Sequence, residues 1–370
     1  MKPIPLSNPD ITDAEISAVT EVLKTPHLSL GPKLPEFEKM MANYIGVEHA
    51  VAVSSGTAAL HLIIRSLGIG EGDEVITTPF SFISSANCIL FERAAPVFVD
   101  IDPQTYNIDV DKIEEKITVK TKAILAVDVF GCPADWKKLE IIAKKHNLKL
   151  IEDSCEALGA EFEGKKTGSF GEAACFGFYP NKQVTTAEGG VIVTNNPELA
   201  ELCRSMRNQG RGQNRDWLQH GRLGYNYRLS DINCALGIAQ MKRIDELLEK
   251  RQKIADLYNK KLKDISAVRL LADPPNVKRS WFVYVIALAD KYSRNERDNI
   301  LQGLRDKGIE CGNYFTPIHL QPFYADQFGH KKGDFPYTEH VAERTIALPF
   351  YNNLKEEQIN FIVETLRSLL

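Results

Sequence analysis

Three short segments of the sequence carry side chains that could act together on one ligand. The first is Ser-Ser-Gly-Thr at 54–57, where an apolar, β-branched run meets an apolar helical pattern. A helix that begins there offers free N–H groups and a positive end to a phosphate, and Ser55 and Thr57 could add hydroxyl donors beside Gly56. Because capped helices often follow strands, this segment alone is weak support for phosphate binding.

The second segment, Ile-Glu-Asp-Ser at 151–154, places a carboxylate at the end of a predicted buried strand. Open α/β sheets bind ligands at that end of their strands. Asp153 could pair there with a cationic ring nitrogen and keep it protonated, which makes a pyridoxal ring an effective electron sink. The alternative role for Asp153 is to cap the turn that follows.

The third segment, Phe-Tyr-Pro-Asn-Lys at 178–182, brings a lysine just past another buried strand. Partial desolvation would favour the neutral amine of Lys182, a nucleophile toward an aldehyde, although a lone lysine is usually solvated. Phe82 also follows a strand end and could stack on a ring, with a place in the core as the alternative. A phosphate cradle, a ring-nitrogen partner and a Schiff-base lysine, in that order, together predict pyridoxal 5'-phosphate as the cofactor.

A fourth feature is a concentration of arginines between residues 204 and 228, against one acid, Asp216, in a chain of net charge −4. Guanidinium groups suit bidentate contact with phosphate, so the segment could hold a nucleoside diphosphate, including one across a dimer interface. The alternative is a solvated or interface loop, and the sequence leaves both readings open. The six arginines are Arg204, Arg207, Arg211, Arg215, Arg222 and Arg228.

Seven apolar, β-branched runs must position these segments. Helical patterns such as 136–146 separate several of them, so we expect an α/β fold with a mostly parallel sheet of seven strands, covered on both faces. Thr12 and Glu15 predict a capping box at the start of an earlier helix. The seven runs are 49–55, 74–79, 95–101, 122–130, 148–154, 173–179 and 189–195.

The character of the sequence changes after residue 195. A polar, glycine-rich loop at 209–227 precedes a long helix, which starts near Ser230 and continues through Leu248. The remainder is α+β, with one strong strand at 281–288 and a last helix around 359–366. We therefore predict a large domain at 1–245 and a smaller C-terminal domain at 246–370, as the length of 370 residues suggests.

Composition narrows the class of protein. The net charge gives no reason to expect a nucleic-acid partner. The sequence has no run of 18 uninterrupted apolar residues and no apolar N-terminal run that could serve as a signal peptide, so we expect no membrane partner. Seven scattered cysteines, without a CxxC pair, favour small buried side chains over metal or disulfide roles. We expect a cytoplasmic protein that binds no metal.

Taken together, these segments resemble the DegT/DnrJ/EryC1/StrS family of sugar aminotransferases, which have the aspartate-aminotransferase fold, fold type I. The resemblance runs from about residue 30 to residue 325 and continues more weakly beyond, and its combination of motifs is specific. The matching segments include SSGTAALHL, EVITTPFSFISSAN, IEDSCEALGA, FYPNKQVTTAEGG, LGYNYRLSDINCALG and PIHLQPFY.

The resemblance implies a role for each cofactor contact. Lys182 would bind the cofactor covalently and move protons, and Asp153 would pair with the pyridine nitrogen. The other contacts would be Ser55, Gly56, Thr57, Phe82, Glu156 near the ring hydroxyl and, from the neighbouring subunit of a homodimer with shared sites, Asn226. Many relatives have Gln or His in place of Glu156, although perosamine-type synthases resemble this chain in having Glu. Relatives usually have a phosphate-binding serine in place of Gly177.

The activity that the resemblance implies is transfer of an amino group from glutamate to the keto group of a nucleotide-linked keto-deoxy sugar, in polysaccharide or glycan biosynthesis. The alternatives are a sugar dehydratase of the same fold and a non-catalytic regulatory protein. Dehydrating relatives have histidine at the lysine position, so Lys182 argues against the first, and its pairing with Asp153 argues against the second. Candidate substrate contacts are Arg222, Arg228, Tyr314 and His319.

Overall fold

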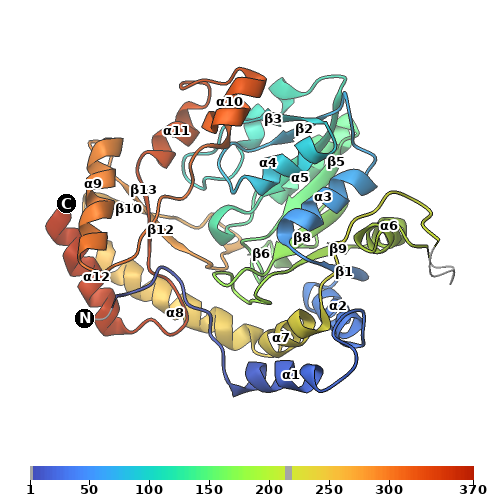
Figure 1. The fold of residues 1–370 in the computed structure, drawn as a ribbon. Coiled ribbons are helices and arrows are strands. Elements are labelled where there is room, and N and C mark those ends of the chain that lie inside the picture. Colours follow the sequence, from blue (N-terminus) through green and yellow to red (C-terminus); the bar gives the residue numbers. More distant parts are fainter. Residues whose placement is uncertain (1–2, 213–218) are drawn as a thin grey trace.

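A seven-stranded sheet forms the centre of the protein in the computed structural model, which describes residues 3–212 and 219–370 (Figure 1). The strands lie in the order β1-β9-β8-β5-β4-β2-β3, and all neighbours are parallel except β9, which is antiparallel to β1 and β8. Each of the seven apolar runs forms one strand, so the predicted mostly parallel sheet is confirmed. The strands are β1 (His49–Val53), β2 (Glu74–Thr77), β3 (Ala95–Phe98), β4 (Thr121–Val127), β5 (Lys149–Asp153), β8 (Ala173–Gly177) and β9 (Gly190–Thr194).

Helices cover both faces of this sheet, because successive residues of a strand point in opposite directions and the strands are apolar on both sides. The covering helices are α2 (Lys33–Ile45), α3 (Gly56–Ser66), α4 (Ser84–Phe91), α5 (Trp136–His146), α6 (Pro197–Arg207) and α7 (Asp231–Met241). On β1, Val51 packs in one cluster with α3 and α6, whereas Ala52 packs in another with α2 and α7.

The predicted start of the first helix is confirmed, but the long helix after Ser230 is not one helix. Thr12 and Glu15 form the capping box of α1 (Asp13–Leu23). The later pattern instead forms α7 and then α8 (Ile244–Leu262), so the prediction of a continuous helix is wrong. The chain turns at Arg243, whose guanidinium pairs with Asp10, Glu15 and Glu246, and these contacts hold the break.

The C-terminal part forms a second core around a three-stranded antiparallel sheet of β10 (Val268–Leu270), β12 (Tyr284–Leu288) and β13 (Thr345–Leu348). Helices α8, α9 (Arg294–Asp306) and α12 (Glu356–Leu369) pack on it. The predicted strand at 281–288 and the predicted last helix are both present. The division into domains at residue 245 stays a proposal.

Residues near the beginning of the chain also enter this second core, beside residues of α9 and α12. Ile4 is buried there, and its backbone pairs with Gly308 and Glu310 at 2.8 and 3.0 Å. In the described part of the chain, no helix has the length and apolar character needed to cross a membrane. Within residues 3–212 and 219–370, the remaining elements are β6 (Glu161–Phe162), β7 (Lys165–Lys166), β11 (Val277–Lys278), α10 (Pro322–Phe328), α11 (Pro336–Ala342) and four short 3₁₀ helices.

Candidate active site

Asp153 is the last residue of β5, beside the neighbouring parallel strand β8. Its side chain is buried, and Oδ2 accepts a hydrogen bond of 2.8 Å from Ser85 Oγ on α4. Oδ1 accepts the backbone N–H of Cys155 at 3.2 Å, so the carboxylate also caps the turn after the strand. Sequence reasoning missed Ser85, because a serine in the first turn of a helix carries no signal of its own.

Lys182 lies in the turn after β8, and helix α8 holds the backbone of that turn. The N–H of Lys182 donates to Tyr179 O at 2.9 Å, and its carbonyl accepts from Arg251 Nη2 at 2.7 Å. The Nζ atom lies 4.1 Å from the centre of the Phe282 ring. Arg251 is buried, and burial lowers the pKa of its guanidinium to about 10. Sequence reasoning missed Arg251, because a lone arginine on an amphipathic helix is normally solvated.

The side chains of Lys182 and Tyr314 both lie near that of Glu156. Glu156 is buried, and its Oε2 accepts the backbone N–H of Phe130 at 2.8 Å. Burial raises the pKa of Glu156 to about 7, although the positive charge of Lys182 acts to lower it. Burial also raises the pKa of Tyr314, and the charge of Glu156 adds to that rise. The structure therefore brings these three side chains together, and Glu156 can hold a proton near neutral pH.

The Ser-Gly-Thr segment begins α3, as the sequence predicts. Ser55 is the N-cap residue, and its Oγ accepts the backbone N–H of Ala58 at 3.1 Å. Because that hydroxyl only accepts in this bond, its own proton is free to be donated to an anion. Thr57 Oγ1 lies 2.7 Å from Ser84 Oγ, which links the start of α3 to the start of α4.

Two glycines narrow the space around this helix start. A Cβ atom at Gly56 would lie 2.8 Å from Cys155 Sγ, so a side chain there would displace the turn after Asp153. A Cβ atom at Gly177 would lie 3.4 Å from the same sulfur, which is an ordinary contact. Gly56 is therefore required by close packing, whereas Gly177 leaves room for a small side chain.

Phe82 and Asn226 are both exposed in the single chain. The Phe82 side chain is 61% exposed, which excludes the alternative that it belongs to the core. Asn226 lies on an extended segment between Tyr225 and Tyr227, and its side chain faces solvent. Both residues are therefore free to contact a ligand or another subunit.

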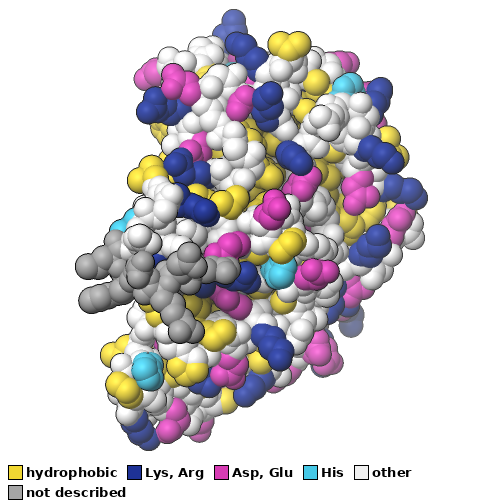
Figure 2. Space-filling model, turned by 90° about the vertical axis from the view of Figure 1, so that its right-hand side faces the viewer, with side chains coloured by type: hydrophobic (Ala, Val, Ile, Leu, Met, Phe, Trp, Pro, Cys, Tyr) yellow, Lys and Arg dark blue, Asp and Glu magenta, His cyan; other side chains and the backbone are white. Residues whose placement is uncertain are grey.

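Two of the six predicted arginines belong to the fold. Arg204 and Arg207 lie on α6, and each donates to a backbone carbonyl of β1, at 3.3 and 2.6 Å. Arg207 is also buried in an ion pair with Glu38. The prediction of one loop of six arginines is therefore wrong for these two, and Arg215 lies outside the described residues. On the face shown in Figure 2, basic and acidic side chains are intermixed.

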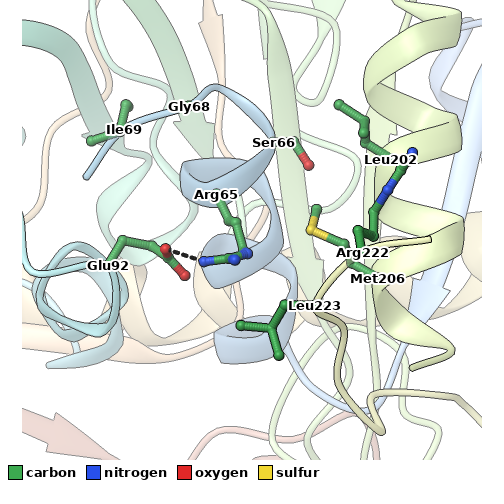
Figure 3. A pocket seen from close by; sticks show the side chains of 9 residues that line it. All are labelled: Arg65, Ser66, Gly68, Ile69, Glu92, Leu202, Met206, Arg222 and Leu223. Atoms are coloured by element: carbon green, nitrogen blue, oxygen red, sulfur yellow. Dashed lines mark hydrogen bonds and ion pairs between the residues drawn. The ribbon is translucent and has the colours of Figure 1, made fainter. Parts of the chain in front are cut away.

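The predicted substrate arginines lie on the segment that precedes α7. Arg228 is half buried and donates to Asn208 Oδ1 at 3.1 Å. Arg222 is exposed and lines a cavity of about 350 Å³ beside the ion pair of Arg65 and Glu92 (Figure 3). Among the described residues, none of the predicted cofactor contacts lines this cavity, so Arg222 is not grouped with them within one chain.

His319 is not brought to a surface. Its side chain is completely buried, its Nε2 lies 3.1 Å from Glu339 Oε1, and its ring packs 4.7 Å from the ring of Phe335. This placement contradicts the prediction of a direct contact between His319 and a sugar, because a sugar could reach the ring only if the surrounding packing opened.

The sequence matches the DegT/DnrJ/EryC1/StrS aminotransferase family over residues 9–367. It is 37% identical to the GDP-perosamine synthase of Escherichia coli O157:H7, over 99% of this chain and 98% of that protein. PseC of Helicobacter pylori, an aminotransferase involved in the biosynthesis of pseudoaminic acid, has a TM-score of 0.94 and 32% identity, covering 100% of this chain and 99% of its own. Spr1654 of Streptococcus pneumoniae, in its PMP-form, has a TM-score of 0.94 and 30% identity. The match covers 99% of this chain and 98% of that chain. The chain therefore belongs to the DegT/DnrJ/EryC1/StrS aminotransferase family.

Proposed function

We propose that this protein is a pyridoxal 5'-phosphate-dependent aminotransferase that transfers an amino group from glutamate to a keto sugar linked to a nucleoside diphosphate. One observation carries the proposal. The adjacent parallel strands β5 and β8 end side by side and bring together a nucleophilic lysine, an oriented carboxylate and a carboxyl that can hold a proton. Asp153 is the last residue of β5, Glu156 follows it, and Lys182 lies in the turn after β8. Membership of the aminotransferase family and the PMP-form of Spr1654 support the same cofactor.

The residues present fit the cofactor. The start of α3 offers backbone N–H groups and the Ser55 hydroxyl to a phosphate, and Gly56 keeps the approach open. The exposed ring of Phe82 is available for stacking. Asp153 presents a buried carboxylate that Ser85 and Cys155 hold in one orientation.

The chain's own residues then have distinct tasks. Bound pyridoxal 5'-phosphate would supply an electron sink for the substrate's carbon–hydrogen bond. Asp153 stabilises a positive charge placed opposite its carboxylate, and Lys182 Nζ is the group that can take up and return a proton. Glu156, whose pKa burial raises to about 7, can hold a proton near neutral pH, and its Oε1 is the oxygen that does not accept the N–H of Phe130. Arg251 keeps the turn of Lys182 in place.

The cofactor assignment is tested by borohydride reduction. The purified protein is supplied with pyridoxal 5'-phosphate and reduced, and the modified peptide is mapped by mass spectrometry. We expect the pyridoxyl group on Lys182, and none in a Lys182→Arg variant with an unchanged circular dichroism spectrum. A label on another lysine, or no label after the cofactor is supplied, contradicts the proposal.

The nucleotide-sugar substrate is supported by the relative that is named GDP-perosamine synthase and by the remaining exposed arginine, Arg222. We propose Arg222, Arg228 and Tyr314 as substrate contacts. Loss of a charged hydrogen bond to phosphate costs about tenfold or more in binding. Arg222→Ala should therefore raise KM for the nucleotide sugar by that factor and leave KM for glutamate unchanged.

The matched control for this change is Arg93→Ala, which removes an arginine that pairs with Glu71 on the surface. It should change neither KM. Equal effects of Arg222→Ala on both substrates would contradict a diphosphate contact. The sugar is identified by adding a panel of nucleotide keto-sugars to the enzyme in its pyridoxamine form and recording which one restores the pyridoxal spectrum.

We also propose a homodimer in which each site is completed by Asn226 of the partner subunit. The exposure of Asn226, Phe82 and Leu223 in the single chain supports this proposal, because a partner subunit could cover these side chains. All seven cysteines are free thiols, which fits a reducing cytoplasm.

A further inference from the structure

His61 lies in the middle of α3, six residues after Ser55, and is only 4% exposed. Its Nε2 is 2.7 Å from Glu92 Oε1, and its Nδ1 is 3.1 Å from the Tyr227 hydroxyl. Since an ionised carboxylate can only accept, Nε2 carries the proton and Nδ1 accepts the Tyr227 O–H. Burial lowers the pKa of His61, which agrees with this neutral ring. The ring is therefore held by a hydrogen bond on each side.

Glu92, which follows α4, connects the same group to two further side chains. Its Oε2 accepts from Arg65 Nη1 at 2.5 Å, and this ion pair forms one wall of the cavity in Figure 3. Its Oε1 also accepts from the Tyr225 hydroxyl at 3.3 Å. The largely buried Glu92 carboxylate is thus compensated by an arginine, an imidazole and a phenol, and these hydrogen bonds restrain one another.

The two tyrosines of this network flank Asn226. Their rings are stacked, with centroids 4.9 Å apart and an angle of 11° between the planes. Residues two apart on an extended chain point to the same side, and the residue between them points to the other. Because Tyr225 and Tyr227 face His61, Asn226 faces away from α3 and is exposed.

The backbone of the same segment is tied to the phosphate cradle. Tyr227 O accepts the N–H of Ser54 at 2.8 Å, immediately before Ser55, and the N–H of Tyr227 donates to Arg207 O at 2.9 Å. Helix α3 therefore presents its N-terminus to the cofactor of its own subunit and, through His61, fixes the segment that carries Asn226.

We propose that His61 is a positioning residue for the partner subunit's cofactor site. The His61–Glu92 pair holds the hydroxyl groups and stacked rings of Tyr225 and Tyr227, and so orients Asn226 toward the phosphate bound in the partner subunit. His61 itself touches no cofactor. The inference rests on the proposed shared site. It makes α3 a common support for two phosphate contacts that belong to two different active sites.

The first test measures the dissociation constant of pyridoxal 5'-phosphate for apo-dimers by absorbance titration. The variants are His61→Phe and the milder Tyr227→Phe, which removes only the hydroxyl. Both should weaken binding by about three- to tenfold, the effect expected for losing the order of one hydrogen-bonded contact. The control is Tyr292→Phe, which removes a hydroxyl that donates to Leu370 O far from the site, and it should change nothing. Unchanged affinity in Tyr227→Phe and His61→Phe overturns the proposal.

The second test determines which subunit's site is affected. Differently tagged subunits, one carrying Tyr227→Phe or His61→Phe and the other Lys182→Ala, are refolded together and the mixed dimer is purified. Only the first subunit has the lysine that binds the cofactor covalently, and its site receives Asn226 from a chain with an intact His61. The affinity of that covalent site should return to the wild-type value. An affinity that stays weak means that His61 acts within its own subunit, which overturns the inference.

A third mixed dimer separates failure of this inference from failure of the proposed function. It pairs Lys182→Ala with Asn226→Glu, whose carboxylate repels the phosphate. A shared site leaves one intact site in each such dimer, so about half of the wild-type activity should be present. If this dimer is active while the His61 dimer is not restored, only the role of His61 is wrong. If it is inactive, the shared site is wrong, and the inference falls with it.

Discussion

At the scale of single residues, Gly56 and Gly177 show how little space separates a required glycine from a replaceable one. Both lie against Cys155, whose backbone N–H is bonded to Asp153. A Cβ atom at Gly56 would lie 2.8 Å from the sulfur, which is too close, whereas one at Gly177 would lie 3.4 Å away, which is an ordinary contact. A change at either position therefore reports on the turn that orients Asp153.

We predict opposite effects of substitution at these two glycines. Gly56→Ala should shift the turn and weaken binding of pyridoxal 5'-phosphate by about tenfold, within the usual cost of overpacking. Gly177→Ser should be tolerated and should strengthen binding a few-fold, because it adds a hydroxyl beside the start of α3. Gly177→Ala is the control and should be neutral. Absorbance titration of the apo-proteins with pyridoxal 5'-phosphate checks all three variants. If Gly177→Ala weakened cofactor binding as much as Gly56→Ala, position 177 would have no room for a small side chain.

The residues that sequence reasoning could find are those that follow strand ends. Lys182 and Asp153 stand out because a charged side chain directly after an apolar run is unusual. Ser85 and Arg251 could not be found in this way, since Ser85 lies 68 residues from Asp153, Arg251 lies 69 residues from Lys182, and their helices look ordinary. His319 illustrates the opposite error, because a histidine predicted to contact the sugar is fully buried.

At the scale of elements, two carboxyl groups at the ends of β4 and β5, those of Asp128 and Glu152, share one proton. Ser154 Oγ lies 2.6 Å from Asp128 Oδ2 and 2.7 Å from Glu152 Oε1, and both carboxyl groups are fully buried. A hydroxyl has one proton and can donate it once, so the second contact requires a protonated carboxyl. Burial accordingly raises the pKa of Asp128 to about 7 and that of Glu152 well above its usual range.

This shared proton makes stability depend on pH. An acid whose pKa is higher in the folded state than in the unfolded state stabilises the fold. This contribution is complete when the pH is below the unfolded-state pKa of about 4, and it is lost as the pH rises through the folded-state pKa of about 7. The free energy of unfolding should therefore fall between these limits, by up to about 1.4 kcal/mol per pH unit for one proton. Asp128→Asn should flatten this slope, because its amide can donate without a titrating proton.

Urea unfolding at a series of pH values measures the effect. Glu156 also has a raised pKa and contributes its own slope, so the comparison is between variant and wild type. Asp111→Asn, at an exposed ion pair with Lys138, is the control and should keep the wild-type slope. An Asp128→Asn slope equal to that of wild type would mean that the carboxyl pair does not hold the proton.

Element order was the most predictable level of the fold. Apolar runs and their helical spacers predicted all seven strands, and the fold-type-I architecture that the resemblance implies is confirmed by structures with TM-scores of 0.94. The break between α7 and α8 could not be read from periodicity, because the apolar spacing continues across it. Arg243 lies at the break, and its partners Asp10 and Glu15 are more than 225 residues away in the chain.

At the scale of the whole molecule, the first residues of the chain complete the core of its last third. Ile4 packs among residues of α8, α9, β12 and α12. The segment is also held at Leu6, whose N–H donates to Glu310 Oε2 and whose carbonyl accepts from Phe350 N, each at 2.9 Å. Chain order alone would have placed these residues with the central sheet.

We therefore predict that Ile4→Ala lowers the free energy of unfolding by about 2–4 kcal/mol, the usual loss for a fully buried isoleucine. Ile11→Ala, at a side chain that is 42% exposed, should change it by less than about 0.5 kcal/mol. Urea unfolding followed by the fluorescence of Trp281, which lies in the same core as Ile4, compares the two, with the other two tryptophans replaced by phenylalanine in every variant. A loss of unfolding free energy in Ile4→Ala as small as that in Ile11→Ala would mean that the N-terminal segment contributes nothing to this core. A loss confined to Ile4→Ala means that the first and last parts of the chain must fold together.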